Sequence, residues 1–191
     1  MTDRQEDQIQ PKKKRGKLSG IVISIAIFCV IMFGAKFLGR QSGIQRAMQD
    51  VQQECIAQGA PTGYMGAKWL MSMSQVKSLF PDATEFTPRN LKLDTTAFGR
   101  PAFVDFVFTD NLLLMIIISF KGEKTEGTYR QTHVLVEKEY GAFPEPSSTS
   151  EHILYSKKKI GRIKIEHLLY QSLGMPIEQV GLYRTKENTA Y

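Results

Sequence analysis

The chain has 191 residues, a formal net charge of +6 and two cysteines. This length has room for one compact domain beside a short N-terminal segment, and two cysteines are too few for a disulfide framework. Residues 1–40 carry eight Lys or Arg against three Asp or Glu, whereas residues 41–191 have a net charge of only +1. Because nearly all of the excess positive charge lies in the N-terminal segment, the sequence argues against a nucleic-acid-binding domain.

The N-terminal segment has the charge and hydrophobicity pattern of a membrane anchor. Residues 1–17 are polar and predict a short cytoplasmic tail without stable structure. Leu18–Ala35 then has eighteen residues without a charge, close to the roughly 20 apolar residues that cross a bilayer as a helix. We predict a transmembrane helix over residues 18–38. The positive charges expected to orient this helix are those of Lys12, Lys13, Lys14, Arg15 and Lys17.

The apolar run lacks the end of a cleavable signal peptide. Such a peptide has an apolar region of about 7–15 residues that ends in a small-x-small cleavage site. Here the run is longer, and Phe33 stands where the site needs a small residue before Ala35. The sequence therefore predicts an uncleaved anchor, with the rest of the chain on the far side of the membrane.

Residues 39–62 are predicted to form a juxtamembrane helix and a linker. An apolar stripe recurs at helical spacing, and glycines and a proline at residues 59–63 then break the chain. The stripe consists of Ile44, Met48, Val51 and Cys55. It favours a helix that packs on the following domain. Self-association into a homo-oligomer is the alternative, because fewer than two heptads do not establish a coiled coil.

Residues 63–186 are predicted to form the folded domain, and residues 187–191 a C-terminal tail. The first helix of the domain covers Met73–Phe80. Ser72 and Gln75 have the spacing of a capping box, in which each side chain bonds the other residue's backbone amide. Proline follows directly and cannot continue the helix.

A second helix is predicted over Thr128–Tyr140. Thr128 and Gln131 repeat the capping-box spacing, and an apolar stripe follows at helical intervals. Gly141 is typical of the residue that ends a helix. The two helices therefore divide the domain into two successive units.

Strands are predicted after each helix. Alternating or continuous apolar residues indicate strands over Asn90–Phe98, Ala102–Thr109, Leu112–Phe120, Glu151–Lys157, Arg162–Gln171 and Glu178–Thr185. Asp110-Asn111 is suited to a two-residue hairpin turn because both residues tolerate positive φ. The seven consecutive apolar residues at 112–118 are too few to span a bilayer and predict a central strand covered on both faces.

Residues 162–173 are ambiguous, because their leucines also fit a helix. The β-branched pair Ile163 and Ile165 favours a strand, which places His167 on the same face as both isoleucines. With this choice the fold class is α+β: an N-terminal transmembrane helix, then an antiparallel sheet of about six strands with two helices on one face. The element order corresponds to two α-β-β-β units.

Two strings resemble a known family. MSMSQVKSLFP at Met71–Pro81 resembles the G-M-[ST]-x-x-x-V-x-x-L motif that opens BamE/SmpA-type envelope proteins and beta-lactamase-inhibitor-like domains. Tyr140-Gly141, near Pro144, is similar to the L-x-x-K-Y-G-x-P ending of such modules. In element order the resemblance covers residues 69–186, with Leu70 in place of the usual glycine. It implies a small helix-on-sheet domain of the bacterial periplasm that binds other proteins.

Residues that carry chemistry in other proteins lack their usual partners here. Ser74 and Lys77 match S-x-x-K, but the S-D-N and K-T-G strings that accompany it in penicillin-binding enzymes are missing. His133, His152 and His167 have no metal-ligand spacing and fall in different predicted elements. We therefore predict no catalytic, metal-binding or cofactor-binding residue, and we do not expect an enzyme.

The predicted domain has one basic cluster. Its members are Lys157, Lys158, Lys159, Arg162 and Lys164. A solvated hairpin tip is the simplest interpretation of such a cluster. The sharper alternative is an interaction patch for an acidic partner or an anionic lipid headgroup.

The sequence thus predicts a non-enzymatic protein-interaction module anchored in the bacterial inner membrane. The N-terminus would lie in the cytoplasm and the domain in the periplasm, where an edge strand or the sheet face would recruit another envelope protein. Envelope assembly and inhibition of a hydrolase are the roles considered. The alternative is a small-ligand-binding or enzymatic domain with a cleft between helices and sheet.

Overall fold

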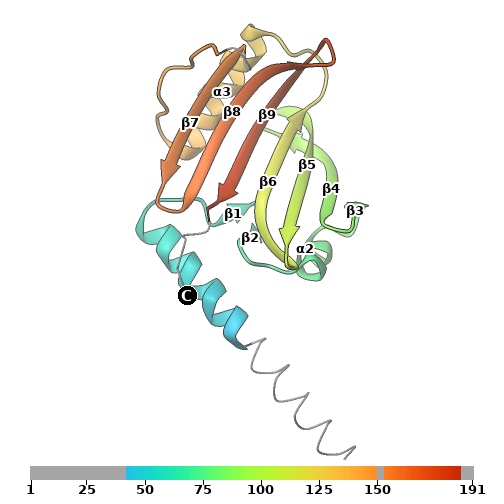
Figure 1. Cartoon of the computed structure of the whole chain (residues 1–191), viewed down its shortest axis with the longest axis vertical. Coiled ribbons are helices and arrows are strands. Elements are labelled where there is room, and N and C mark those ends of the chain that lie inside the picture. The colour runs from blue at the N-terminus through green and yellow to red at the C-terminus, as the bar shows by residue number, and fades with distance from the viewer. Residues whose placement is uncertain (1–41, 150–152, 186–191) are drawn as a thin grey trace, which may run out of the picture. The chain divides into compact units, whose positions relative to one another are not determined.

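The structure is a computed structural model that describes residues 42–149 and 153–185. The chain divides into two units between Gly43 and Ile44, and apart from Ser42 and Gly43 the residues described below belong to the second. Within the described residues the fold is α+β, with three helices and a seven-stranded antiparallel sheet (Figure 1). The predicted fold class is confirmed at this level.

The elements follow one another in two groups. A helix over residues 42–57 precedes the labelled elements, which are β1 (Gly63–Tyr64), β2 (Ala67–Lys68), α2 (Met73–Leu79), β3 (Thr84–Thr87), β4 (Asn90–Ala97), β5 (Arg100–Thr109), β6 (Leu112–Phe120), α3 (Glu126–Tyr140), β7 (Leu154–Ile160), β8 (Ile163–Ser172) and β9 (Met175–Arg184). β1 and β2 form a separate two-stranded hairpin. Four strands follow α2 and three follow α3, so the two groups differ by one strand.

The sheet order is β3-β4-β5-β6-β9-β8-β7. Each group is a meander of neighbouring antiparallel strands, and the groups join where β6 pairs with β9. In that junction Ile117 lies opposite Gly181 and Ile118 opposite Val180. The apolar run at residues 112–118 therefore lies in the middle strand of the sheet, as predicted.

The prediction of about six strands missed β3. All four residues of this strand are exposed, including Phe86 at 66%. An edge strand with no buried side chain has no apolar alternation for a sequence reading to detect. β3 is held in place by its backbone pairing with β4 and by Lys92, whose ammonium lies 4.5 Å from the centre of the Phe86 ring.

The N-terminus of α2 is capped as predicted. The Ser72 hydroxyl accepts from the Gln75 amide at 3.3 Å, and the Gln75 side chain accepts from the Ser72 amide at 2.8 Å. The predicted capping box at Thr128 and Gln131 is wrong. α3 begins two residues earlier, at Glu126, and its cap is Thr125, which exchanges reciprocal hydrogen bonds with Thr128.

The tight turns use residues in the left-handed region of φ. Asp110 and Asn111, with φ of 53° and 62°, join β5 and β6 as predicted. The ambiguous stretch forms β8 from Ile163 to Ser172, which confirms the strand prediction. The β8–β9 turn then uses Leu173 at φ 51° and Gly174 at φ 78°.

One face of the sheet carries the core and is covered; we call it the covered face. Val104, Phe106, Ile116 and Ile118 of the middle strands have no exposed surface, and α3 lies behind β7 and β8 in Figure 1. The helix over residues 42–57 also contributes to this core through Val51 and Cys55, and Met48 packs against it. The predicted packing of its apolar stripe is therefore confirmed for these three members.

The opposite face of the sheet differs from the prediction. The apolar run in β6 was expected to be covered on both sides. Instead Met115 and Ile117 are only half-buried, although Ile116 and Ile118 beside them are fully buried. The physical reason is that the described helices and the β1–β2 hairpin contribute to the core on one side of the sheet only.

Several predictions lie outside the described residues. These are the cytoplasmic tail at residues 1–17 with its orienting lysines and arginine, the transmembrane helix at 18–38, His152 and the tail at 187–191. Among residues 42–149 and 153–185, no helix is long and apolar enough to cross a membrane.

Candidate functional sites

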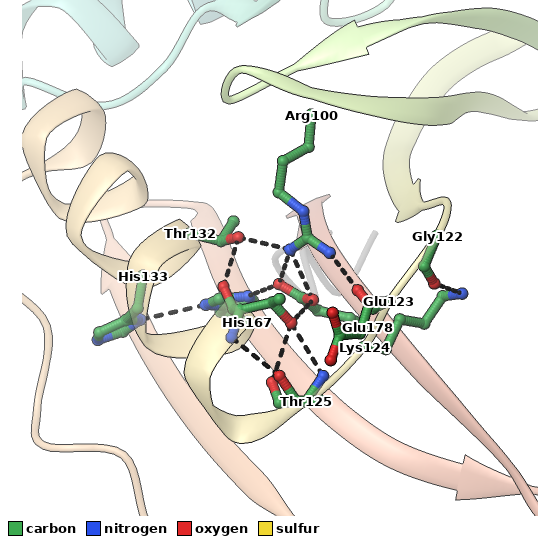
Figure 2. Close-up of polar contacts among 10 residues, drawn as sticks. Arg100, Gly122, Glu123, Lys124, Thr125, Thr132, His133, His167 and Glu178 are labelled. Atoms are coloured by element: carbon green, nitrogen blue, oxygen red, sulfur yellow. Dashed lines mark hydrogen bonds and ion pairs between the residues drawn. The ribbon is translucent and has the colours of Figure 1, made fainter.

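A network of polar side chains crosses the space between α3 and the covered face. Figure 2 shows Arg100 at the start of β5, Thr132 and His133 on α3, His167 on β8 and Glu178 on β9. Thr132, His167 and Glu178 have no exposed surface, and His133 is 7% exposed. Burial at this depth requires that each polar group find a partner.

The centre of the network is the ion pair between Arg100 and Glu178. Nη1 of Arg100 donates to both carboxylate oxygens of Glu178 at 2.7 Å and to the Thr132 hydroxyl at 2.7 Å. Nη2 donates to the Glu123 carbonyl at 2.8 Å, and the Thr132 hydroxyl donates to the Thr128 carbonyl at 2.9 Å. One guanidinium thus joins β5, β9, α3 and the loop before α3.

Two histidines extend the network from this carboxylate towards the surface. His167 Nε2 lies 3.3 Å from Glu178 Oε1, and His167 Nδ1 lies 3.2 Å from His133 Nδ1. Because the carboxylate only accepts, His167 donates from Nε2 and accepts at Nδ1 from His133. His133 Nε2 then faces Glu137 Oε1 at 3.9 Å. Tyr129 stacks on His167, with ring centroids 3.9 Å apart.

The charges in the network are set by burial and by direct partners. Burial alone would raise the pKa of Glu178, but hydrogen bonds from His167 and Arg100 lower it below its ordinary value. Burial lowers the pKa of both histidines. The carboxylate of Glu178 raises the pKa of His167 and that of Glu137 raises the pKa of His133, but burial is the larger effect at each. The network therefore holds one carboxylate, one guanidinium and two neutral imidazoles at neutral pH.

Glu178 and His167 are arranged like the carboxylate and histidine of a catalytic relay, but neither side chain is accessible to solvent. A catalytic base must come within hydrogen-bond reach of its substrate. A substrate would reach His167 only if α3 separated from the sheet, because this side chain and Glu178 have no exposed surface. In this geometry the network acts as a cross-link that fixes α3 on the sheet.

The opposite side of the sheet, which we call the open face, is a second candidate site. Successive strand residues alternate between faces, so the neighbours of the buried core residues point to this side. Its half-buried apolar and aromatic side chains are Phe103, Val107, Met115, Ile117, Tyr155, Leu168, Tyr170 and Tyr183. Aromatic residues and Met are enriched where proteins bind each other.

Charged side chains frame the aromatic residues of the open face. Lys92 and Lys121 lie over the Phe103 ring, with their ammonium groups 4.7 and 4.0 Å from its centre. Glu166 accepts from the Tyr155 hydroxyl at 2.9 Å and pairs with Lys164 at 3.2 Å. The surface thus offers flat aromatic contact area together with accessible charges of both signs.

A cavity of about 620 Å³ is the third candidate site. Its wall consists of residues 59–65, Phe98 in the β4–β5 turn, and Glu139 and Tyr140 at the end of α3. The Tyr140 hydroxyl is buried and has no hydrogen-bond partner among the described residues. The cavity does not contain the histidines of the buried network.

The five basic residues predicted as a patch are distributed over different parts of the structure. Lys157 and Lys159 lie within β7 and share the open face with Lys164, since each pairs across to β8 in register. Lys158 points the other way and donates to the Tyr140 carbonyl at 2.9 Å. Arg162, in the turn, pairs with Glu54 at 3.1 Å. The strands predicted at Glu151–Lys157 and Arg162–Gln171 left residues 158–161 for the turn, but β7 continues to Ile160, so the turn is shorter than predicted.

The S-x-x-K residues do not form a catalytic pair. The Ser74 hydroxyl lies 3.0 Å from the Ser72 hydroxyl at the helix cap, whereas the Lys77 ammonium bonds the Ala83 carbonyl beyond the helix. No group of three or more His, Cys, Asp or Glu in the described part of the chain has a metal-binding arrangement.

The sequence interpretation missed Arg100 and Glu178. Glu178 alternates in phase with Val180 and Leu182, so its inward position could have been read from the period of two. Arg100 falls between the predicted strands Asn90–Phe98 and Ala102–Thr109, and nothing near it in the sequence indicates a partner 78 residues away. Sequence reasoning placed His167 correctly on the buried side but had no means to bring it beside His133.

Comparison with known proteins adds no relative. No family model matches the chain, and neither does any curated protein or solved structure. The similarity of Met71–Pro81 to the opening motif of BamE/SmpA-type proteins therefore stays a prediction.

Proposed function

We propose that this protein is a non-enzymatic interaction module, held at the bacterial inner membrane, whose open sheet face binds another envelope protein. The observation that carries the proposal is the difference in side-chain burial between the two faces of the sheet. The side chains of Phe103 and Ile117 are half-buried, whereas those of Phe106 and Ile116 are fully buried. Contiguous apolar surface that a fold leaves uncovered is a common mark of a partner site.

The membrane part of the proposal rests on the sequence. The uncharged run Leu18–Ala35 and the basic residues before it support a single span with a cytoplasmic N-terminus. The resemblance at Met71–Pro81 supports a periplasmic domain in envelope assembly or in inhibition of a hydrolase. A C-terminal reporter fusion tests the orientation: alkaline phosphatase, active only outside the cytoplasm, is expected to be active. Activity only from a reporter that works in the cytoplasm would contradict it.

Photocrosslinking in living cells tests the partner site. A photoreactive amino acid at Ile117 is expected to trap one discrete protein, because this position lies in the centre of the open face. Val134 on α3 is the matched control: it is also apolar and is 62% exposed, but it lies on the outer side of the helix. Equal adducts from both positions, or an adduct from Val134 alone, would contradict the proposal.

A further inference from the structure

The cavity beside the end of α3 has the lining of a site for a positively charged organic group. Its volume of about 620 Å³ lies within the roughly 300–1,000 Å³ range of small-molecule sites. Three of its wall residues are aromatic. The Tyr64 and Phe98 rings stack with centroids 6.3 Å apart, and the Phe98 and Tyr140 rings meet edge to face at 6.4 Å.

Among the described residues that line this wall, Glu139 alone carries a charged side chain. Its negative charge adds to burial in raising the pKa of both Tyr64, to about 12, and Tyr140. The field inside the cavity therefore disfavours negative charge at both phenols. Aromatic faces attract cations through their quadrupoles, so the rings and the carboxylate favour the same kind of ligand.

The unpartnered hydroxyl of Tyr140 points to the same chemistry. A buried hydroxyl without a partner is costly. This hydroxyl has almost no exposed surface, so a ligand N–H would relieve the cost once the wall adjusts around the ligand. The nearby cation Lys158 does not fill this role, because its ammonium donates to the backbone carbonyl of Tyr140.

The part of the wall at Pro61 and Thr62 is already fixed without a ligand. Trp69 is fully buried; its indole N–H donates to the Pro61 carbonyl at 2.7 Å, and its backbone amide donates to the Thr62 carbonyl at 3.1 Å. Both acceptors belong to the cavity wall. A wall that is rigid before binding reduces the ordering cost of the ligand.

We propose that this cavity binds an alkylammonium or guanidinium group, held by the rings of Tyr64, Phe98 and Tyr140 and by the charge of Glu139. The source of the group is either a free small molecule or a Lys or Arg side chain of a bound protein. The site is separate from the open face of the sheet, so the failure of one proposal would not decide the other.

The chain contains a single tryptophan, Trp69, which reports on the cavity because it bonds the wall. We would titrate the full-length chain, in detergent and at fixed ionic strength, with butylammonium and butylguanidinium chloride while recording tryptophan fluorescence. 1-Pentanol is the neutral control and butyrate the anionic one. Saturable binding of both cations is expected, with both controls at least about threefold weaker, the low end for an exposed cation–aromatic contact. Equal response to butylammonium and 1-pentanol would overturn the proposal.

Substitutions locate the binding. Glu139→Gln is expected to weaken butylammonium about twofold to fivefold, the range for an exposed charge pair. Glu126→Gln makes the same change at the other end of the same helix, at an exposed pair with Arg130, and is expected to change nothing. If Glu139→Gln binds as tightly as Glu126→Gln, the proposal is wrong.

Tyr140→Phe separates binding from folding. Because the hydroxyl has no partner to lose, the unfolding midpoint is expected to stay unchanged or rise, while butylammonium binds more weakly than to the wild type. Unchanged binding would remove Tyr140 from the site and contradict the proposal. N-acetyl-lysinamide and N-acetyl-argininamide distinguish the two sources: tighter binding than butylammonium indicates a side chain of a protein, and weaker binding a free cation.

Discussion

The two faces of the sheet use polar residues in opposite ways. On the covered face Glu178 is fully buried and bonded by Arg100 and His167, so every strong partner is another part of the fold. On the open face Glu166 is 15% exposed at its side chain and pairs with Lys164 and Tyr155, both of which also meet solvent. The two carboxylates lie on neighbouring paired strands, β8 and β9.

This difference separates stability from recognition. Removing one member of a buried charge pair leaves the remaining charge without a partner and without water, which is costly. Removing one member of an exposed pair leaves the remaining charge in contact with water, which costs little. The covered face is therefore expected to govern folding, and the open face to contribute little to folding and to stay available to a partner. The predictions below test that separation, from the largest expected effect to the smallest.

Glu178→Ala is expected to cause the largest loss of stability. The change leaves Arg100 and His167 without their acceptor in the core, and removing one partner of a buried pair costs about 3–5 kcal/mol. Glu166→Ala, the matched change on the open face, is expected to cost about 1 kcal/mol or less. Urea unfolding followed by circular dichroism measures both, and similar costs for the two variants would contradict the assignment of the faces.

Phe106→Ala and Phe103→Ala compare an apolar residue on each face of the same strand. Phe106 is fully buried and stacks on Phe80 at 5.2 Å, so its truncation is expected to cost about 3–5 kcal/mol. Phe103 is half-buried, and its truncation is expected to cost clearly less. The same unfolding measurement gives both values. If Phe103→Ala costs as much as Phe106→Ala, the open face is part of the core.

The buried histidines predict a pH dependence of stability. Both have a folded pKa below the ordinary 6.5, so between these values the unfolded chain binds more protons than the folded protein. Stability is therefore complete above about pH 6.5 and falls as the pH drops below it. Charged groups facing the pair are Arg100, Arg130, Glu137, Glu145 and Glu178.

Thermal unfolding at pH 7.5 and 5.5 measures this effect, and His133→Gln is expected to reduce the difference because it removes one titrating group. The loss of stability towards pH 5.5 is expected to be smaller than that caused by Glu178→Ala, since the ion pair between Arg100 and Glu178 stays intact. A midpoint that does not fall towards pH 5.5, or a variant with the full wild-type difference, would show that the histidines are not held neutral by burial.

The parts of the fold that the sequence predicted have a local cause. The cap of α2 depends on Ser72 and Gln75, three residues apart, and the β5–β6 turn on the adjacent pair Asp110 and Asn111. The central place of β6 follows from its continuous apolar run. Each signal lies within a few residues and acts without the rest of the chain.

What the sequence did not predict depends on pairings between distant segments. β3 has no buried residue, so only its pairing with β4 reveals it. The network needs Arg100, His133, His167 and Glu178 from four elements, which meet only because β6 pairs with β9. The sequence predicted the cap of α3 at Thr128, whereas the structure has it at Thr125. Both threonines have a capping partner three residues later in the sequence, so local spacing does not distinguish them.

The central claim is that the open face binds a partner without carrying the fold. The most direct test measures two quantities on one variant, Phe103→Ala: its urea unfolding midpoint, and the yield of the adduct trapped from a photoreactive residue at Ile117. We predict a midpoint close to that of the wild type and a severalfold lower adduct yield. An unchanged yield, or a yield that falls only in proportion to the fraction unfolded, would contradict the claim.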